Sequence, residues 1–410
     1  MSHKLPTIDA LQNRPGPLIL LLAALVMIGP FSVDMYLPAF PSIEASFGAS
    51  PAALQQTLSI YLMAYAVMML WHGALADAWG RRPVILASLA IYAIATLGCA
   101  IANNIETLWL FRAMQGVCAG VGLVIGRTIV RDIFHGIAAQ KVMAQITLFF
   151  SIAPAIAPIA GGLLVGLGSW RAVFWGLLIL VVLLLTWCYR ALPETLAPEA
   201  RQSLHPGSLC RNYRTVIFRS EFFLLALTLA LNFAGFFIYI AGAPSFLVKL
   251  LGVSEQGFAW LFVPMVFGTA CGATLAGKLA GRISPEQIIT LGYLCMGVAS
   301  LFNLGLCLFF PANVMWNVLP VMLYTVGSGM IAPNVFLFLL AVFPTLRGLA
   351  SSLQGFLQFS LAALVSAFLV PLIDASLLTL AFGMMAFAVA GGALWMIYRK
   401  TRAPLDSDTF

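Results

Sequence analysis

Residues 73–83 read GALADAWGRRP, and this stretch marks the point where one long apolar segment ends and the next begins. Its two glycines permit a tight turn and a close approach between helices. Asp77 can pair with a nearby arginine or accept hydrogen bonds from a helix N-terminus. Such a contact, made in one conformation and broken in another, would act as a conformational latch; an ordinary surface ion pair in a basic turn is the alternative. The residues of the predicted latch are Gly73, Asp77, Gly80, Arg81 and Arg82.

The composition around this turn is that of a chain surrounded by lipid. Of 410 residues, 62% are apolar and only 9% are charged, whereas soluble domains carry roughly 25% charged residues. A soluble enzyme of this size would need a more polar surface, and a disordered, coiled-coil or collagen-like chain would need a different composition. A helix crosses a bilayer in about 20 residues, so the chain is long enough for about a dozen membrane-spanning helices.

Twelve apolar segments predict an all-α membrane protein with twelve transmembrane helices. One long polar connector divides them six and six. We therefore predict an N-terminal six-helix half over residues 1–192, a cytoplasmic linker over 193–221 and a C-terminal six-helix half over 222–410. The predicted segments are 18–38, 53–76, 83–103, 105–128, 139–166, 172–192, 222–247, 257–281, 286–309, 315–339, 349–373 and 377–398.

The basic residues predict the orientation of these helices, because cytoplasmic loops are enriched in Lys and Arg. If the N-terminus is cytoplasmic, 18 of the 21 basic residues lie on the inner side. Only Arg171 and Lys249 then lie outside, and Arg112 lies within a span. The same asymmetry accounts for the net charge of +7, so the bilayer is the implied partner and a nucleic acid is not. Both termini are expected in the cytoplasm.

The two halves carry a weak internal repeat. Gly73-Ala74-Leu75-Ala76 ends the second segment and Gly277-Lys278-Leu279-Ala280 ends the eighth, an offset of 204 residues. Parallel repeats related about the membrane normal are a transporter arrangement, in which the substrate site lies between the halves near the midplane of the bilayer. The repeat therefore predicts two pseudo-symmetric halves whose rocking gives alternating access.

Two ionisable residues stand out within the predicted spans, Asp34 and Arg112. A charge in the bilayer core costs at least about 2.5–3.5 kcal/mol, so such residues are functional candidates by default. At a rise of about 1.5 Å per residue, both lie in the outer half of the membrane at similar depth. Burial favours the neutral carboxyl of Asp34, and a nearby arginine favours the carboxylate. A group balanced in this way can exchange protons; a static ion pair between helices is the alternative.

Several motifs resemble those of a known family. Residues 73–83 are similar to the loop signature of the major facilitator superfamily, G-x-L-A-D-R-x-G-R-R, with Ala78 in place of an arginine. Residues 108–116, with Arg112, Gln115 and Gly116, resemble the fourth-helix motif of drug–proton antiporters. Residues 157–162 resemble their fifth-helix motif, with Ala157 where glycine is usual. The matching residues of the fifth-helix motif are Pro158, Gly161 and Gly162.

The stretch from Asp34 to Pro41 closely resembles the end of the first helix in the bicyclomycin-resistance (Bcr/CflA) group of drug exporters. Residues 127–132, 192–195 and 332–334 are also similar to that group. The resemblance implies the major facilitator fold and a proton-coupled multidrug efflux transporter of the bacterial inner membrane. Its substrates would be small, partly apolar antibiotics, and it would need no cofactor besides the coupling protons. We expect a monomer.

A transporter of mixed drugs needs an apolar, adaptable cavity with a few polar groups. Amides and aromatic residues that share a helix face within the spans are therefore candidate substrate contacts, and hydrogen bonding between helices is the alternative. His72 is expected at the membrane interface. The candidate substrate contacts are Phe31, Tyr61, Tyr65, Gln115, Asn232, Phe236, Tyr239, Gln354 and Gln358.

Other function classes have less support. An importer or facilitator of a small metabolite is compatible with the same fold, although the drug-antiporter resemblances argue against it. An intramembrane enzyme would need a recognisable pair of reactive groups, and the sequence contains no HExxH and no second buried carboxylate. A signalling receptor would normally carry an additional soluble or extramembrane module, which we do not expect here. The sequence contains no GxxxxGK[ST], so no ATP is implied. The seven cysteines and four histidines have no metal-ligand spacing. We therefore expect no catalytic residue and no metal site.

Overall fold

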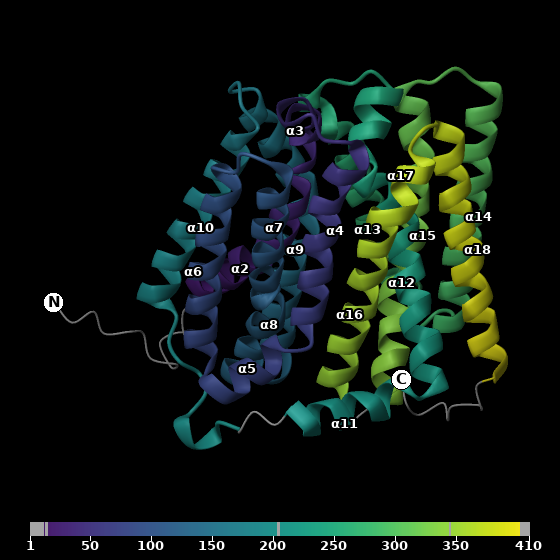
Figure 1. Ribbon diagram of the computed structural model, residues 1–410. Coiled ribbons are helices and arrows are strands. Elements are labelled where there is room, and N and C mark those ends of the chain that lie inside the picture. Colours follow the sequence, from purple (N-terminus) through teal and green to yellow (C-terminus); the bar gives the residue numbers. More distant parts are fainter. Residues whose placement is uncertain (1–11, 13–14, 203–205, 344–345, 402–410) are drawn as a thin grey trace. The chain divides into compact units, whose positions relative to one another are not determined.

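The computed structural model describes residue 12 and residues 15–202, 206–343 and 346–401. Within these residues the chain is helical, and its one β contact is an isolated bridge between Ala280 and Ile283. Twelve helical segments are long and apolar enough to cross a membrane, which confirms the predicted all-α membrane fold. The chain divides into two compact units, residues 1–205 and 206–410, and each is described by itself (Figure 1).

The first membrane-spanning segment is broken rather than continuous. Helix α2 ends at Asp34, and Pro38 and Pro41 occupy the first turns of the two short helices that follow. Proline is tolerated there because the first N–H groups of a helix have no intrahelical partner. The predicted end of this span at residue 38 is therefore too early, since the apolar segment continues to Phe47.

The remaining elements of the first unit follow in chain order. Its helices are α2 (Gly16–Asp34), η1 (Leu37–Ala39), α3 (Phe40–Phe47), α4 (Pro51–Met69), α5 (His72–Trp79), α6 (Arg81–Ala100), α7 (Ile105–Ala119), α8 (Val121–Ile133), α9 (Gly136–Val165), α10 (Arg171–Ala191) and η2 (Pro198–Ala200). The second unit contains α11 (Pro206–Ile217), α12 (Ser220–Ala241), η3 (Pro244–Leu250), η4 (Glu255–Phe258), α13 (Ala259–Leu279), α14 (Pro285–Phe309), α15 (Val314–Val342), α16 (Arg347–Leu364), η5 (Val365–Leu369), α17 (Val370–Ile373) and α18 (Leu377–Thr401).

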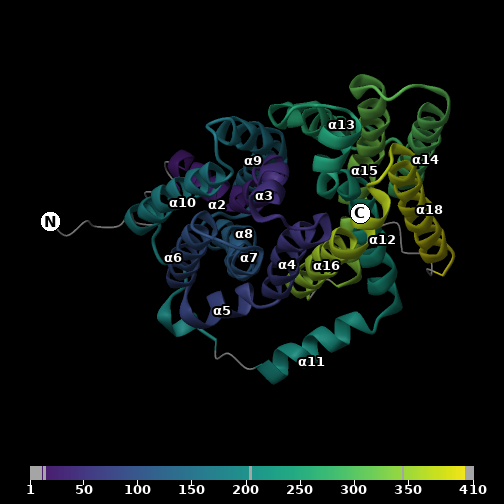
Figure 2. The same cartoon turned by 45° about the horizontal axis from the view of Figure 1, so that its top comes forward.

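Both units pack their helices in the same pattern. In the first unit α4 lies against α7, α2 lies against α9 and α10, and α6 lies against α7 and α10. In the second unit α13 lies against α15, α12 lies against α16 and α18, and α14 lies against α15 and α18. The last of these pairs, α14 with α18, stays side by side in both views (Figures 1 and 2). These pairs correspond in chain order, as expected for two pseudo-symmetric halves.

The described parts of the predicted linker, residues 193–202 and 206–221, fall into different units. The N–H of Gln202 donates to the carbonyl of Asp77 at 3.0 Å, so this part of the linker follows the first unit. Helix α11 belongs to the second unit, where it lies against α12 and α16. The boundary between the units at residues 205 and 206 thus falls inside the predicted linker.

Candidate functional site

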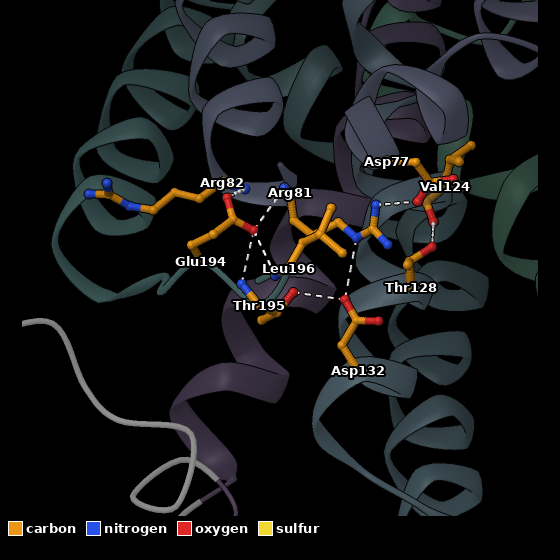
Figure 3. Close-up of polar contacts among 9 residues, drawn as sticks. All are labelled: Asp77, Arg81, Arg82, Val124, Thr128, Asp132, Glu194, Thr195 and Leu196. Atoms are coloured by element: carbon orange, nitrogen blue, oxygen red, sulfur yellow. Dashed lines mark hydrogen bonds and ion pairs between the residues drawn. The ribbon is translucent and has the colours of Figure 1, made fainter. Parts of the chain in front are cut away.

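The turn quoted at the outset is held by charged side chains around Arg81, the first residue of α6 (Figure 3). Nη1 of Arg81 donates to Asp77 of α5 at 2.5 Å, and Nε donates to Asp132 of α8 at 3.3 Å. The hydroxyl of Thr195 donates to the same oxygen of Asp132 at 2.8 Å. The Arg81 side chain is only 7% exposed. One largely buried cation therefore links three segments of the first unit, and removing it would leave two carboxylates without their partner.

Glu194, which follows α10, closes the other side of this network (Figure 3). Its Oε1 accepts hydrogen bonds from the backbone N–H groups of Arg81, Thr195 and Leu196 at 3.0, 2.9 and 3.0 Å. Its Oε2 accepts from the N–H of Arg82 at 3.1 Å. The first N–H groups of a helix lack intrahelical partners and carry partial positive charge. A carboxylate from a distant segment therefore caps the N-terminus of α6.

The two glycines of the predicted latch differ in what the structure requires of them. Gly80 has a φ of +101°, and a Cβ at this position would lie 2.5 Å from Oε2 of Glu194. Both the left-handed backbone and the close carboxylate demand glycine. A Cβ on Gly73 would meet only Val124, at 3.9 Å, which is an ordinary contact. The close approach predicted for Gly73 therefore does not require glycine in this conformation.

Arg82, the remaining latch residue, points away from Arg81. Its Nη2 donates to the carbonyl of Tyr189 at 2.8 Å, and its guanidinium lies over the ring of the same tyrosine. Arg82 therefore ties the start of α6 to the end of α10, and it forms no ion pair within the described part of the chain.

Arg112 of α7 is completely buried, at 0% exposure. Its guanidinium lies between two tyrosine rings, 4.7 Å from the centroid of Tyr36 and 4.3 Å from that of Tyr61. Nη1 donates to the carbonyl of Ser32 at 3.1 Å and to Oε1 of Gln115 at 2.9 Å. Nε and Nη2 have no hydrogen-bond partner among the described residues. A cation–π contact is worth about 2 kcal/mol when desolvated, so the two rings replace part of the lost hydration.

Asp34 lies at the end of α2 and is 4% exposed. Arg112 contacts the carbonyl of Ser32, two residues before Asp34 on the same helix. Asp34, Arg112 and the residues that contact Arg112 are called the predicted coupling cluster below. No ion pair within 4.0 Å joins Asp34 to Arg112, both of which lie in the described part of the chain. The alternative interpretation, a static ion pair that holds two helices together, is therefore not present in this conformation.

One residue of the predicted fifth-helix motif, Gly161, lies directly against Met35, the residue after Asp34. A Cβ on Gly161 of α9 would overlap the carbonyl oxygen of Met35, so α9 approaches this backbone as closely as only glycine permits. Pro158 and Gly162 are buried in the same helix. Pro158 has no N–H to donate, which removes one hydrogen bond from the interior of α9. The motif therefore lies beside the predicted coupling cluster and does not form a separate site.

The aromatic candidates of the first unit lie around Arg112 and the Asp34 turn. Tyr61 covers the guanidinium and donates its hydroxyl to the carbonyl of Gly29 at 3.3 Å. Tyr65 follows one turn later, with its ring centroid 6.2 Å from that of Tyr61. Phe31 is half-buried on α2, three residues before Asp34. Tyr61 and Tyr65 are fully enclosed within the first unit, where they support the cluster.

Gln115 orients Arg112 from the same face of α7. It accepts from Arg112 and donates from Nε2 to the hydroxyl of Thr96 at 2.8 Å, and the Cys99 thiol donates weakly to its Oε1. The side chain is completely buried. In this conformation all of these contacts are made within the protein, as in the alternative interpretation of hydrogen bonding between helices.

The candidates on α12 lie in the second unit. Tyr239 is buried, and its hydroxyl accepts from Nδ2 of Asn303 at 2.7 Å. Asn232 is also buried, and its Oδ1 has no hydrogen-bond partner among the described residues. Phe236 is half-buried and lies edge-on against Phe233. A buried amide oxygen without a partner is costly, so Asn232 keeps its status as a predicted polar contact.

The two glutamines on α16 bind each other. Nε2 of Gln354 donates to Oε1 of Gln358 at 2.8 Å, and Gln354 is buried while Gln358 is half-buried. The predicted sharing of one helix face is therefore seen directly. A role for this pair in substrate binding stays a prediction.

No role was predicted for Asp132 or Glu194, although both lie within stretches that resemble the drug exporters. In the sequence, each of these carboxylates stands just after an apolar segment, which could have marked them as candidates. The sequence does not show that both bind Arg81, Asp132 at its side chain and Glu194 at its backbone N–H. Among the described residues, no group of three or more His, Cys, Asp or Glu side chains is placed to hold a metal ion.

Comparison with known proteins adds the family. Residues 22–367 match the profile of the Major Facilitator Superfamily. The chain is 30% identical to Multidrug resistance protein D of Escherichia coli (strain K12) over 347 residues, which cover 85% of this chain and 86% of that protein. It is 27% identical to the Bicyclomycin resistance protein homolog of Haemophilus influenzae over 351 residues, covering 85% and 87%.

Solved structures share the fold. A D-xylose-proton symporter matches with a TM-score of 0.71 at 14% sequence identity, covering 92% of this chain and 96% of that chain. An identity this low shows the fold alone. The profile match over most of the chain, together with the relatives, confirms the resemblance predicted from the motifs: the chain belongs to the major facilitator superfamily and is a multi-pass membrane transporter rather than an enzyme.

Proposed function

We propose that this protein is a proton-coupled efflux transporter of small, partly apolar drugs in the bacterial inner membrane, with both termini in the cytoplasm. The observation that carries the proposal is the buried carboxyl of Asp34, which has no cationic partner within 4.0 Å among the described residues. A charge inside a membrane-spanning segment is costly and commonly serves transport. Asp34 is the group that binds and releases the coupling proton.

Arg112 acts as the fixed charge of the predicted coupling cluster. Two tyrosine rings, Gln115 and the Ser32 carbonyl hold its guanidinium in place. The carboxylate form of Asp34 is favoured when the turn after α2 moves toward that guanidinium, and the neutral form is favoured when the turn moves away. Because α9 contacts this turn at Gly161, a movement of the turn is transmitted to α9.

The network around Arg81 acts as the latch of the transport cycle. Arg81 joins Asp77 on α5 to Asp132 on α8 in this conformation. Breaking these contacts in the alternate conformation would free α5 from α8, and remaking them would restore the first state. The latch biases which conformation is populated, and protonation of Asp34 decides when it changes.

Export is supported by the names of two relatives, a multidrug resistance protein and a bicyclomycin resistance protein homolog. A D-xylose-proton symporter shares the fold, so the fold by itself does not set the direction of transport. The excess of basic residues at one end of the helices supports cytoplasmic termini.

The test is a drug-susceptibility panel in a bacterial host that lacks its own efflux pumps. Cells expressing the wild type should tolerate several small, partly apolar antibiotics, and cells expressing Asp34→Asn should be as sensitive as cells without the protein. The matched control is Asp374→Asn in the second unit, where Asp374 accepts a hydrogen bond from Ser245 at 2.6 Å. This control should keep resistance, because an asparagine retains the acceptor oxygen.

Loss of resistance counts only if the variant reaches the membrane in wild-type amounts, which immunoblotting of membrane fractions measures. Extrusion from preloaded cells must accompany resistance. Faster uptake into intact cells, with no compound extruded, would replace the proposal with an importer.

A further inference from the structure

Helix α11 lies across the ends of other helices and does not run alongside them. It contacts α12 and α16, which both belong to the second unit, and Figures 1 and 2 show it lying crosswise at the ends of these helices. Only Phe218 and Arg219 separate α11 from α12, which is a membrane-spanning segment. Because α12 enters the membrane at once, α11 must lie at the level of the membrane surface.

The outward face of α11 combines arginines with an aromatic ring. Arg211, Arg214 and Thr215 of α11 are exposed, and so is Phe218, whose N–H continues the helical turn by donating to the carbonyl of Arg214 at 3.2 Å. Their 3, 1, 3 spacing puts these side chains on one side of the helix. Val216 is buried on the opposite side. Phe218 is 78% exposed, and the Arg214 guanidinium lies 5.7 Å from the centroid of its ring. This face therefore offers two cations and an unburied apolar ring side by side.

The charges around α11 have one predominant sign. The described helix ends on this side of the second unit carry eight basic residues and two acidic ones, Glu221 and Glu286. The basic residues are Arg211, Arg214, Arg219, Lys278, Arg282, Arg347, Arg399 and Lys400. Within this set Arg347 begins α16, which α11 contacts. Four of the eight basic residues therefore lie on α11, in the two-residue connection after it, or at the start of the helix that it contacts.

We propose that the outward face of α11 binds the phosphate headgroups of anionic phospholipids, with Phe218 seated at the boundary between headgroups and acyl chains. A helix that lies in the membrane plane with arginines and a large apolar ring on its surface fits the interfacial layer, where guanidinium groups meet phosphate and aromatic rings meet lipid. A soluble anion would use the arginines but leave Phe218 in water. The inference rests on the membrane location of the chain and does not depend on drug export.

Each arginine near an anionic membrane surface contributes about 1 kcal/mol, or roughly fivefold in affinity. Replacing Arg211 and Arg214 by glutamine should therefore weaken binding of an anionic lipid by about 25-fold. Both side chains are exposed, so the fold should survive. The matched control, Arg399→Gln with Lys400→Gln, removes the same charge from the same end of the unit but leaves α11 intact.

The experiment titrates the full chain, purified in a neutral detergent, with phosphatidylglycerol and counts bound lipid by native mass spectrometry. Phosphatidylcholine with the same acyl chains and inorganic phosphate are the comparison probes. The wild type should bind phosphatidylglycerol at least tenfold more tightly than phosphatidylcholine, and the control should stay within threefold of the wild type. Phe218→Ser, which keeps every charge, should weaken phosphatidylglycerol binding without abolishing it.

Three results would overturn the proposal. If the wild type bound phosphatidylglycerol and phosphatidylcholine with equal affinity, the lipid would not be recognised through its negative charge. If the α11 variant and the Arg399/Lys400 control lost the same amount of affinity for phosphatidylglycerol, the binding would depend on the net charge of the protein and not on α11. Competition by inorganic phosphate at the same concentration as the lipid, with no effect of Phe218→Ser, would identify a soluble anion as the ligand.

Discussion

Helices α6 and α14 occupy equivalent places in the two units, and they begin in different ways. The N-terminus of α6 has no side-chain cap of its own and is held by Glu194, more than a hundred residues further along the chain. Ser284 caps α14 locally: its hydroxyl accepts from the N–H of Gln287, and the Gln287 side chain accepts in return from the N–H of Ser284. The second unit closes this turn on itself, whereas the first ties it to α8 and to the segment after α10.

The interiors of the two units also differ, in whether they bury charged side chains. Within its spans the first unit buries the charged Asp34 and Arg112, and also Arg81 at the first residue of a span. The buried polar residues in the described spans of the second unit are uncharged, and they include Asn232, Asn303 and Tyr324. This difference teaches that long-range coupling and buried charge belong to one half of an otherwise repeated architecture. The second half supplies a neutral counterpart.

Replacing Arg112 should have the largest effect. In Arg112→Lys the charge remains, but the planar group between Tyr36 and Tyr61 is lost, and ammonium cannot reproduce stacking. We expect transport to fall at least tenfold, since a loss of about 2 kcal/mol exceeds one factor of ten. Drug extrusion from proteoliposomes measures it. In the second unit, Tyr324→Phe should leave transport unchanged, because this buried hydroxyl has no hydrogen-bond partner among the described residues.

The two helix caps should differ in strength. Glu194→Ala removes the acceptor of four backbone N–H groups, and we expect it to cost about 3 kcal/mol, because hydrogen bonds to charged groups are worth about 1.5–3 kcal/mol. Ser284→Ala should cost about 1 kcal/mol, as usual for a local cap. The midpoint of thermal unfolding in detergent measures both. Equal shifts for the two variants would contradict the comparison.

The glycines in the two turns provide a finer test. Gly80 and Gly281 both have positive φ, +101° and +77°, but a Cβ would meet Glu194 at the first and nothing within 4 Å at the second. Gly281→Ala should therefore cost only the backbone strain, about 1–2 kcal/mol. Gly80→Ala should cost about 1 kcal/mol more, because Glu194 must move and its hydrogen bonds weaken. Parallel unfolding measurements decide whether the difference exists.

His72 should give an effect that is absent at neutral pH and appears only in acid. It lies between two spans, and its side chain is buried within the protein; the residue 204 positions later is Ala276. Burial lowers the pKa of His72 from 6.5 to about 4, partly opposed by the backbone of Val117. The folded chain thus binds fewer protons than the unfolded chain between these values, and its stability falls as the pH drops from 6.5 toward 4.

At pH 5 this loss amounts to about 2 kcal/mol, and at pH 7.5 it vanishes. In His72→Leu that part of the acid sensitivity should be absent. Unfolding midpoints of both proteins at the two pH values measure it. The same acid-induced shift in wild type and variant would assign the sensitivity to other groups.

The parts of this structure that could be predicted from sequence are those that depend on residues close together in the chain. The predicted features are the twelve spans, the turn at residues 73–83 and the buried Asp34 and Arg112. They could be predicted because the length of an apolar segment, and a charged residue within it, are visible in the sequence. The first span was predicted too short. In the sequence, Pro38 and Pro41 resemble the end of a helix, whereas in the structure each lies in the first turn of a further short helix.

Partners across the fold were not predictable. A helical period shows which residues share a face, but it does not show which helix that face meets. The aromatic contact of Tyr36 with Arg112, the shared partner of Asp77 and Asp132, and the cap by Glu194 all join distant segments. The lack of an ion pair between Asp34 and Arg112 also depends on the distance between their side chains, which sequence does not contain.

The central claim, that Asp34 carries the coupling proton, is tested most directly by proton movement in proteoliposomes that enclose a pH-sensitive dye. A drug gradient imposed across the membrane should drive protons in the opposite direction in the wild type and in Asp374→Asn. Asp34→Asn should show no such movement at equal protein density. Drug-driven proton movement that persists at the wild-type rate in Asp34→Asn would contradict the claim.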